Sequence, residues 1–285
     1  MLTIVGFIVV AGAVIGGFIM EGGQLLVLFQ PAEFLIIGGA ALGALLVTTP
    51  INVLKELTRQ IMASFKPGYT KKDYTGQMVM LYEIFNIARR EGLVGLESHI
   101  EKPHESGVFK RYPGFLKNHH AVSFMSDTMR LIITGSVQPH ELEALLDVDL
   151  ETHHDEKDTP PTILGNIADS LPGLGIVAAV LGVVITMGAI GGPPEEIGHK
   201  VGAALVGTFL GVLLCYGFVG PLTHSIRIYN KSEAGYMQCL KLCLLAFCKG
   251  FPPSIAVEYG RRSIPSDVRP SFVEVEDACK LTRKS

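Results

Sequence analysis

The chain has 285 residues, a formal net charge of −3, 48% hydrophobic residues and only 18% charged residues. Soluble domains carry about 25% charged residues, so this composition, with a mean hydropathy of +0.37, argues against an ordinary cytosolic enzyme. The near-neutral charge gives no support for nucleic-acid binding, which needs a basic surface.

Four long stretches that lack Asp, Glu, Lys and Arg predict four membrane-spanning helices. They cover residues 1–20, 34–54, 170–194 and 201–226. Each is long enough to supply the roughly 20 apolar residues that cross a bilayer. No Lys or Arg precedes Lys55, so the first stretch lacks the basic start of a secretory signal peptide, and we expect it to remain in the protein.

The distribution of basic residues predicts the orientation of these spans. The loop 51–169 holds 13 of the 24 Lys and Arg residues and the tail from Arg227 holds 10, whereas the two short turns hold only Lys200. Cytoplasmic segments next to spans carry the excess of Lys and Arg. We therefore expect both chain ends, the large loop and the tail to be cytoplasmic, with two short turns facing outward.

The segments outside the spans show helical periodicity and no strand pattern. Apolar side chains recur at three- and four-residue spacing in 78–88 and 122–133. Pro139 opens another predicted helix, with Glu141 in its first turn. The remaining expectations are a helix at 236–247, loops at 103–113 and 152–161, and a poorly ordered end at 263–285.

These elements predict an all-α, polytopic membrane protein with a helical cytoplasmic domain. Its expected segments are the first two spans (1–50), the cytoplasmic helical domain (51–169), the last two spans (170–226), and a cytoplasmic helix and tail (227–285).

The spans offer hydroxyl groups but no ionisable side chain near their centres. Glu33 and Asp169 stand at span ends, whereas Thr186 and Thr208 lie inside the third and fourth spans, with Tyr216 about two turns beyond Thr208. Ion transporters usually bury an ionisable group in the membrane. Either a partner helix supplies the missing carboxylate, or the chain is a membrane scaffold without an ion role.

Glycines and prolines predict close packing and interrupted helices. Gly-x-x-x-Gly pairs let helices approach closely, and they serve packing within the chain or contact with a partner helix. Pro172 is expected at the first position of a span helix, where proline is tolerated, and Pro221 is expected to kink the next helix. The glycine pairs are Gly12 and Gly16, Gly39 and Gly43, and Gly207 and Gly211.

Three stretches resemble the MotA family of flagellar stator subunits, in the MotA/TolQ/ExbB proton channel superfamily. They are Leu-Pro-Gly-Leu-Gly-Ile-Val-Ala-Ala-Val-Leu-Gly at 171–182, the glycine-rich run 201–222, and Arg-Arg-Glu-Gly at 89–92 followed by Leu-Glu at 96–97. The order of two spans, a large helical loop, two spans and a basic tail is also similar to that family. The resemblance covers the chain from its start to about Phe251.

The resemblance implies a motor subunit of the bacterial inner membrane. Five such chains would surround a dimer of a single-span MotB-type partner, which carries the membrane aspartate and grips peptidoglycan. Ion flow would then drive torque on the rotor switch protein FliG, rotating the flagellum in chemotaxis. The implied contacts are partner, rotor and membrane lipid, with no cofactor, metal or nucleic acid.

The resemblance also assigns roles to residues of this sequence. The expected rotor contacts are the charged residues Arg89, Arg90 and Glu97. The residues expected to couple ion flow to movement are the prolines Pro172 and Pro221. The residues expected to line the ion path are Ala179, Thr186, Thr208 and Tyr216.

The transported ion is predicted to be H⁺ rather than Na⁺. Sodium-driven relatives similar to PomA tend to carry Thr where this chain has Ala179, and hard cations prefer oxygen ligands. An alanine offers no such oxygen, whereas a proton needs none.

Besides the membrane scaffold without an ion role, two alternatives compete with the stator interpretation. An ExbB/TolQ-type energiser of an envelope transport complex usually has three spans and an external N-terminus. A membrane-embedded enzyme is disfavoured because no Gly-x-Gly-x-x-Gly, His-Glu-x-x-His or P-loop pattern occurs. The adjacent histidines at 119–120 and 153–154 give little support for a metal site.

Overall fold

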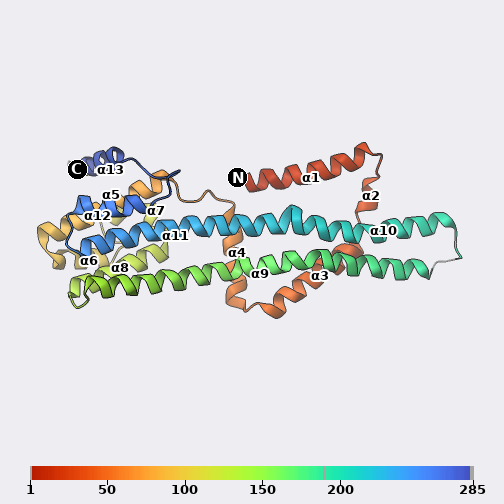
Figure 1. Cartoon of the computed structure of the whole chain (residues 1–285), viewed down its shortest axis with the longest axis horizontal. Coiled ribbons are helices and arrows are strands. Elements are labelled where there is room, and N and C mark those ends of the chain that lie inside the picture. Colours follow the sequence, from red (N-terminus) through yellow and green to blue (C-terminus); the bar gives the residue numbers. More distant parts are fainter. Residues whose placement is uncertain (1, 189–190, 283–285) are drawn as a thin grey trace. The chain divides into compact units, whose positions relative to one another are not determined.

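The computed structural model describes residues 2–188 and 191–282, and over these residues the chain is helical without strands (Figure 1). The first helices are α1 (Leu2–Met20), α2 (Leu25–Leu28), α3 (Pro31–Thr48), α4 (Ile51–Ser64) and α5 (Lys71–Glu91). Short elements follow: η1 (Leu93–Leu96), α6 (Glu97–Glu101), η2 (Phe109–Arg111) and α7 (Pro113–Leu116). The rest are α8 (His119–Thr134), α9 (Pro139–Met187), α10 (Pro194–Leu213), the π-helical η3 (Leu214–Val219), α11 (Gly220–Cys248), α12 (Pro253–Ser263) and α13 (Phe272–Thr282).

The predicted all-helical fold with four membrane-spanning helices is confirmed. Four helical segments are long and apolar enough to cross a bilayer: Leu2–Met20, Leu25–Thr48, Pro139–Met187 and Pro194–Cys248. The last two extend well beyond the predicted spans at 170–194 and 201–226, because each continues as helix into the segments outside the membrane.

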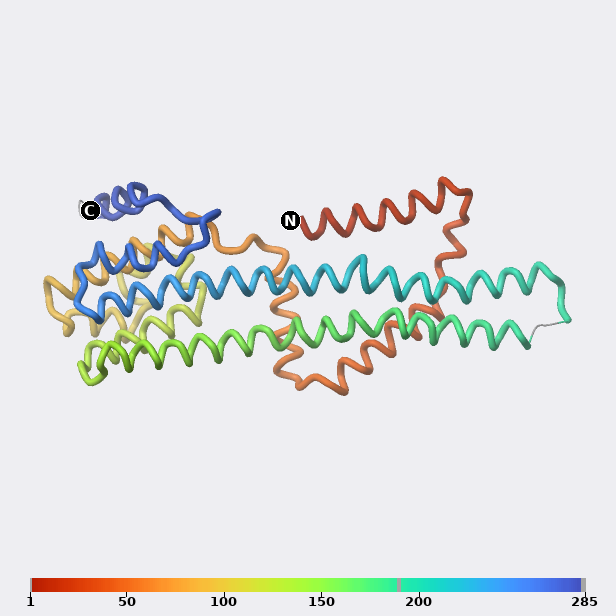
Figure 2. Tube along the Cα trace, in the orientation of Figure 1, coloured from red at the N-terminus to blue at the C-terminus, as the bar shows by residue number. Residues whose placement is uncertain are grey.

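The described chain forms two compact units, whose trace can be followed in Figure 2. The first, which we call the span unit, comprises Met1–Pro67 and Glu156–Tyr229. The second, the core unit, comprises Gly68–Asp155 and Asn230–Ser285. Helices α9 and α11 contribute residues to both units.

The core unit is built around α5, whose buried side chains include Tyr74, Met78 and Phe85. α5 contacts α7, α12 and α13, and Phe85 stacks on Phe247 of α11 with ring centroids 4.3 Å apart. The helix starts at a capping box formed by Thr70 and Asp73, which satisfies two otherwise unpaired N–H groups. This core confirms the helices predicted at 78–88, 122–133 and 236–247.

In the span unit, α9 and α10 approach each other through glycines. A Cβ placed on Gly175 would lie 2.7 Å from the carbonyl oxygen of Gly207 and 3.1 Å from Cα of Gly211. Further along the same crossing, a Cβ on Gly182 would lie 3.0 Å from Cα of Ala204. Residues without bulky side chains let the two backbones touch, as is common between membrane helices.

The loop predicted at 152–161 is wrong, because α9 runs through it without a break. Pro161 has no N–H to donate to the carbonyl of Lys157, which normally leaves that oxygen unpaired. Here the side-chain amide of Gln60, which is buried in α4, donates to the Lys157 oxygen at 3.2 Å. A contact from another helix therefore sustains helical structure at a double proline.

The disorder predicted for 263–285 is wrong over Phe272–Thr282, which form α13; residues 283–285 lie outside the described residues. Ser271 and Glu274 form reciprocal capping bonds at the start of α13, with Ser271 N–H donating to the Glu274 carboxylate at 2.6 Å. Lys71 of α5 also binds Glu274, at 2.7 Å. These bonds lower the pKa of Glu274 from 4.5 to about 2, the Lys71 hydrogen bond being the largest cause.

We predict that Gly175→Ala destabilises the span unit by about 1–3 kcal/mol, the usual cost of overpacking. The added methyl meets the α10 backbone, which cannot move aside as a side chain would. Gly173→Ala is the matched control, because a Cβ there has nothing within 4 Å. Thermal unfolding of the purified protein in detergent measures both variants, and equal melting temperatures would contradict the packing assigned to α9 and α10.

We predict that acidification loosens α13 from α5. The folded pKa of Glu274 lies below its ordinary value, so its contribution is present above about pH 4.5 and is lost as the pH falls towards about 2. Hydrogen exchange of the α13 amides across this range measures the effect. Glu274→Gln should remove most of this pH dependence. Glu276→Gln should retain it, because Glu276 pairs with Lys280 inside α13 itself.

Candidate functional site

Two of the residues predicted to line an ion path, Ala179 and Thr208, lie at the α9–α10 crossing. A Cβ placed on Gly207 would be 3.1 Å from the backbone nitrogen of Ala179, and one on Gly175 would be 3.3 Å from Cα of Thr208. Ala179 and Thr208 are both half-buried. The structure therefore brings a small apolar residue of α9 and a threonine of α10 to one place.

The other two predicted path residues, Thr186 and Tyr216, lie in different surroundings. Thr186 is fully buried, and its hydroxyl donates to the carbonyl oxygen of Gly182 one turn earlier, at 2.8 Å. Tyr216 is 72% exposed and belongs to the π-helical segment η3. The change from α- to π-helical winding alters the register between Thr208 and Tyr216, so the structure does not bring Tyr216 to the crossing.

Both predicted coupling prolines stand where the helical hydrogen-bond ladder is interrupted. Pro172 lies in the interior of α9, so the expectation of a first-turn proline is wrong, and the carbonyl of Ala168 receives no backbone N–H from it. Pro221 follows η3, where the Gly220 N–H donates to the carbonyl oxygen of Cys215 instead of making an α-helical bond. The interruption expected at Pro221 thus takes the form of a π-helical turn.

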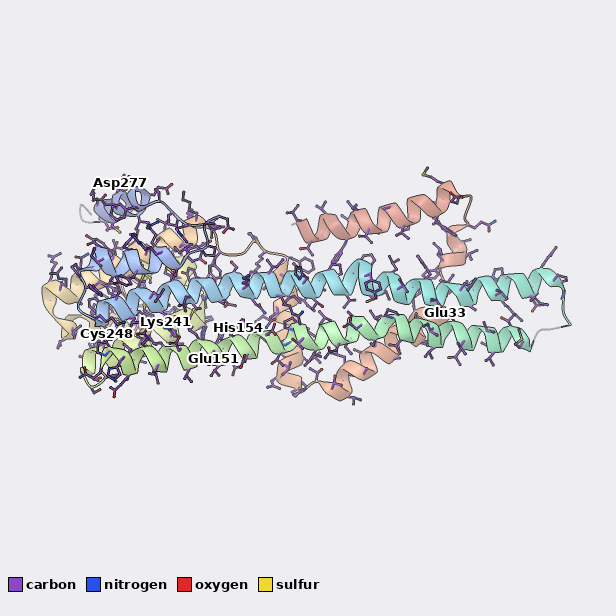
Figure 3. The ribbon with its side chains drawn as sticks, in the orientation of Figure 1. Glu33, Glu151, His154, Lys241, Cys248 and Asp277 are labelled. Atoms are coloured by element: carbon purple, nitrogen blue, oxygen red, sulfur yellow. The ribbon has the colours of Figure 1, made fainter. Side chains whose placement is uncertain are left out.

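Glu33 belongs to this crossing, although the sequence places it only at a span end. It lies in the first turn of α3 (Figure 3) and is 7% exposed. Its carboxylate oxygen Oε2 lies against Gly207. No hydrogen-bond partner for that oxygen occurs among the residues described. Burial of α3 against α9 and α10 is a tertiary contact, which the local sequence around Glu33 does not signal.

The predicted rotor-contact residues stand on either side of the turn that ends α5, in the core unit. Arg89 and Arg90 stand in the last turn of α5, and Glu97 opens α6. Gly92, with φ of 79°, makes the turn that ends α5. The three charged side chains are exposed, and within the described chain none of them forms an ion pair.

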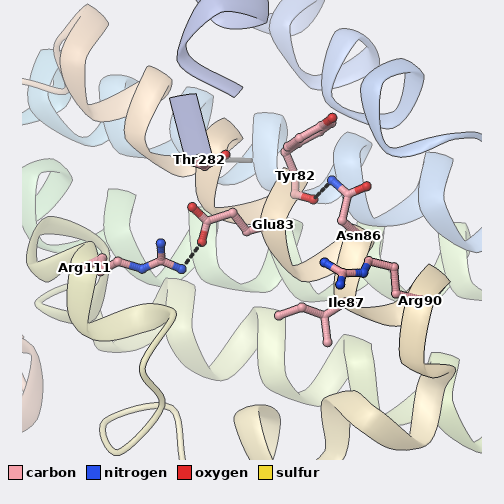
Figure 4. A pocket seen from close by; sticks show the side chains of 7 residues that line it. All are labelled: Tyr82, Glu83, Asn86, Ile87, Arg90, Arg111 and Thr282. Atoms are coloured by element: carbon pink, nitrogen blue, oxygen red, sulfur yellow. Dashed lines mark hydrogen bonds and ion pairs between the residues drawn. The ribbon is translucent and has the colours of Figure 1, made fainter. Parts of the chain in front are cut away.

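Arg90 also lines a pocket of about 760 Å³ (Figure 4). Arg111 lines the same pocket, but its guanidinium is bound to Glu83 at 2.5 Å. Glu83 also accepts a hydrogen bond from the Tyr112 hydroxyl at 2.9 Å. Burial, followed by that hydrogen bond, raises the pKa of Tyr112. Arg90 is therefore the cation on this pocket wall without an ion-pair partner in the described chain.

Two of the histidines in the core unit, one from each adjacent pair, stack on each other. The ring centroids of His120 on α8 and His153 on α9 are 3.6 Å apart. Over residues 2–188 and 191–282, no group of three or more His, Cys, Asp or Glu side chains is placed to hold a metal ion.

Comparison with known proteins places this architecture in a family. Residues 4–92 match the family described as Motility protein A N-terminal, and residues 117–238 match the MotA/TolQ/ExbB proton channel family. A solved structure of C. jejuni MotAB matches with a TM-score of 0.77 at 19% identity, covering 94% of this chain and 98% of that chain. That likeness supports the fold.

Curated relatives match over nearly their whole length. The motility protein A chains of Salmonella typhimurium and Escherichia coli are each 42% identical over 284 residues, 99% of this chain and 96% of theirs. Chemotaxis protein LafT of Vibrio parahaemolyticus is 39% identical over 97% of both chains. With four membrane-spanning helices and these matches, the chain belongs to the motility protein A family, within the MotA/TolQ/ExbB proton channel family.

Proposed function

We propose that the chain is the ring-forming stator subunit of a bacterial flagellar motor, in the inner membrane with both termini cytoplasmic. The observation that carries this proposal is the 42% identity to motility protein A over 99% of the chain. Five copies would surround a dimer of a MotB-type partner, and H⁺ flow between them would drive torque on FliG. The name of the matching solved structure, C. jejuni MotAB, supports such a partner.

Uncovered helix surfaces support assembly with other chains. α1 has no buried residue, and a Cβ placed on Gly12, Gly39 or Gly43 would have nothing within 4 Å. The third glycine pair differs, because Gly207 and Gly211 already pack against α9 of the same chain. Small-residue faces on α1 and α3 therefore stay available for neighbouring helices or lipid.

The ExbB/TolQ-type alternative fits less well. Four membrane-spanning helices occur where that type usually has three, and residues 4–92 match the family described as Motility protein A N-terminal.

The charged end of α5 suits brief contacts with a moving partner. Exposed ion pairs stabilise a complex little, but opposite charges accelerate encounter. The three charged residues Arg89, Arg90 and Glu97 are exposed and make no ion pair in the part of the chain that is described. The two arginines therefore remain available to acidic groups of the rotor, and Glu97 to basic ones.

We predict that Arg89→Glu combined with Arg90→Glu abolishes swimming while leaving stator assembly intact, because both changes lie on the surface. Lys102→Glu is the control, a charge reversal at an exposed lysine that pairs locally with Glu105. Swimming speed and the membrane fluorescence of tagged stators separate torque from assembly. Normal swimming of the double variant would favour a membrane scaffold over a motor.

We predict that motility persists without sodium and collapses when a protonophore is added. Ala179 at the α9–α10 crossing supplies no side-chain oxygen to replace the hydration of Na⁺. Swimming speed in sodium-free medium, with and without the protonophore, measures this. Swimming that requires sodium would reject H⁺ as the transported ion.

A further inference from the structure

Glu33 is an acidic side chain inside the span unit that the assigned path does not use. The sequence places it at the end of a span, where water would surround it, yet it is 7% exposed. Its Oε2 has no hydrogen-bond partner among the described residues. A buried carboxylate oxygen without a partner is costly, and an acidic group inside a membrane is a functional-site hypothesis.

The fold makes room for this carboxylate at a defined place. Gly207 is the residue it lies against, and any Cβ there would collide with Glu33 Oε2. The same Cβ would be 3.2 Å from Ala178 Cβ and 3.1 Å from the backbone nitrogen of Ala179. The carboxylate therefore reaches the helix crossing that also holds Ala179 and Thr208.

No opposite charge on the packed helices explains the burial of Glu33. On α9, the nearest ionisable residue before Ala178 is Asp169, nine positions away, and it is itself acidic. On α10, His199 and Lys200 precede Gly207 by about two turns, or roughly 10 Å for Lys200 at 1.5 Å per residue. α2, which also contacts α10, has no ionisable side chain.

We propose that Glu33 is a proton-loading site of this chain on the outer side of the ion path. Its carboxylate binds a proton from the external water and releases it inward along the α9–α10 crossing, towards the carboxylate that a partner helix supplies. The proton alone moves, and Glu33 returns to its ionised form after each transfer. The proposal rests on the proposed stator function and on the outward orientation of the turn before α3.

The test measures single-motor speed at low load, so that ion supply limits rotation. Cells that lack their own stators express the full chain with its MotB-type partner. In alkaline external medium, where protons are scarce, Glu33→Gln should slow the motor by about tenfold, the lower end of the effect of a charged cleft on ion capture. In acidic medium its speed should approach that of the wild type, because bulk protons then suffice.

Two variants act as controls. Glu33→Asp keeps the carboxylate and should restore most of the alkaline speed. Glu21→Gln removes an exposed acid from the neighbouring turn and should leave speed unchanged. Wild-type speed of Glu33→Gln at every pH, or an equal loss in Glu21→Gln, overturns the proposal. If the wild-type complex fails to rotate the motor at all, the stator function fails instead.

A chemical measurement on the wild-type complex covers the case in which Glu33→Gln does not assemble. Dicyclohexylcarbodiimide is an apolar reagent that modifies protonated carboxyl groups. Mass spectrometry should find Glu33 modified and Glu21 unmodified, and the modification should decrease as the external medium becomes alkaline. An unmodified Glu33, or modification independent of external pH, overturns the proposal.

Discussion

The contact on which the span unit depends is the direct approach of α9 to α10 without intervening side chains. Gly175, Gly207 and Gly211 have their backbones in contact, and a single added methyl would meet main-chain atoms. Lipid tails are as apolar as the helices, so packing geometry rather than the hydrophobic effect holds such a pair together. Every residue assigned to the crossing, including Ala179 and Thr208, owes its position to that approach.

Interruptions of the helices are concentrated around the same contact. Pro172 precedes the crossing on α9, and the π-helical η3 with Pro221 follows it on the α10 side. Missing ladder bonds lower the resistance of a helix to bending. The two features thus have different roles. The glycines fix where the helices touch, and the prolines leave the adjoining turns deformable.

Much of the fold was predictable because its signals are local. Four uncharged stretches set the spans, and three- and four-residue periodicity set α5 and α8. The capping pattern Ser271-x-x-Glu274 was also a local signal for α13, but the charged, proline-containing tail around it obscured that signal.

Burial of Glu33 could not be predicted, because it depends on Gly207, a residue of another helix. The family resemblance identified the charged residues Arg89, Arg90 and Glu97 in the sequence, whereas only the structure showed that they are exposed.

The bond from Gln60 to the Lys157 carbonyl has a consequence for biosynthesis. The two residues are 97 positions apart, and the donor comes first. A ribosome therefore finishes α4 long before it makes Pro160 and Pro161, so the amide is already present when the weak point of α9 emerges. The helical structure of α9 at that point thus depends on Gln60 of α4, and the order of synthesis ensures that α4 is made first.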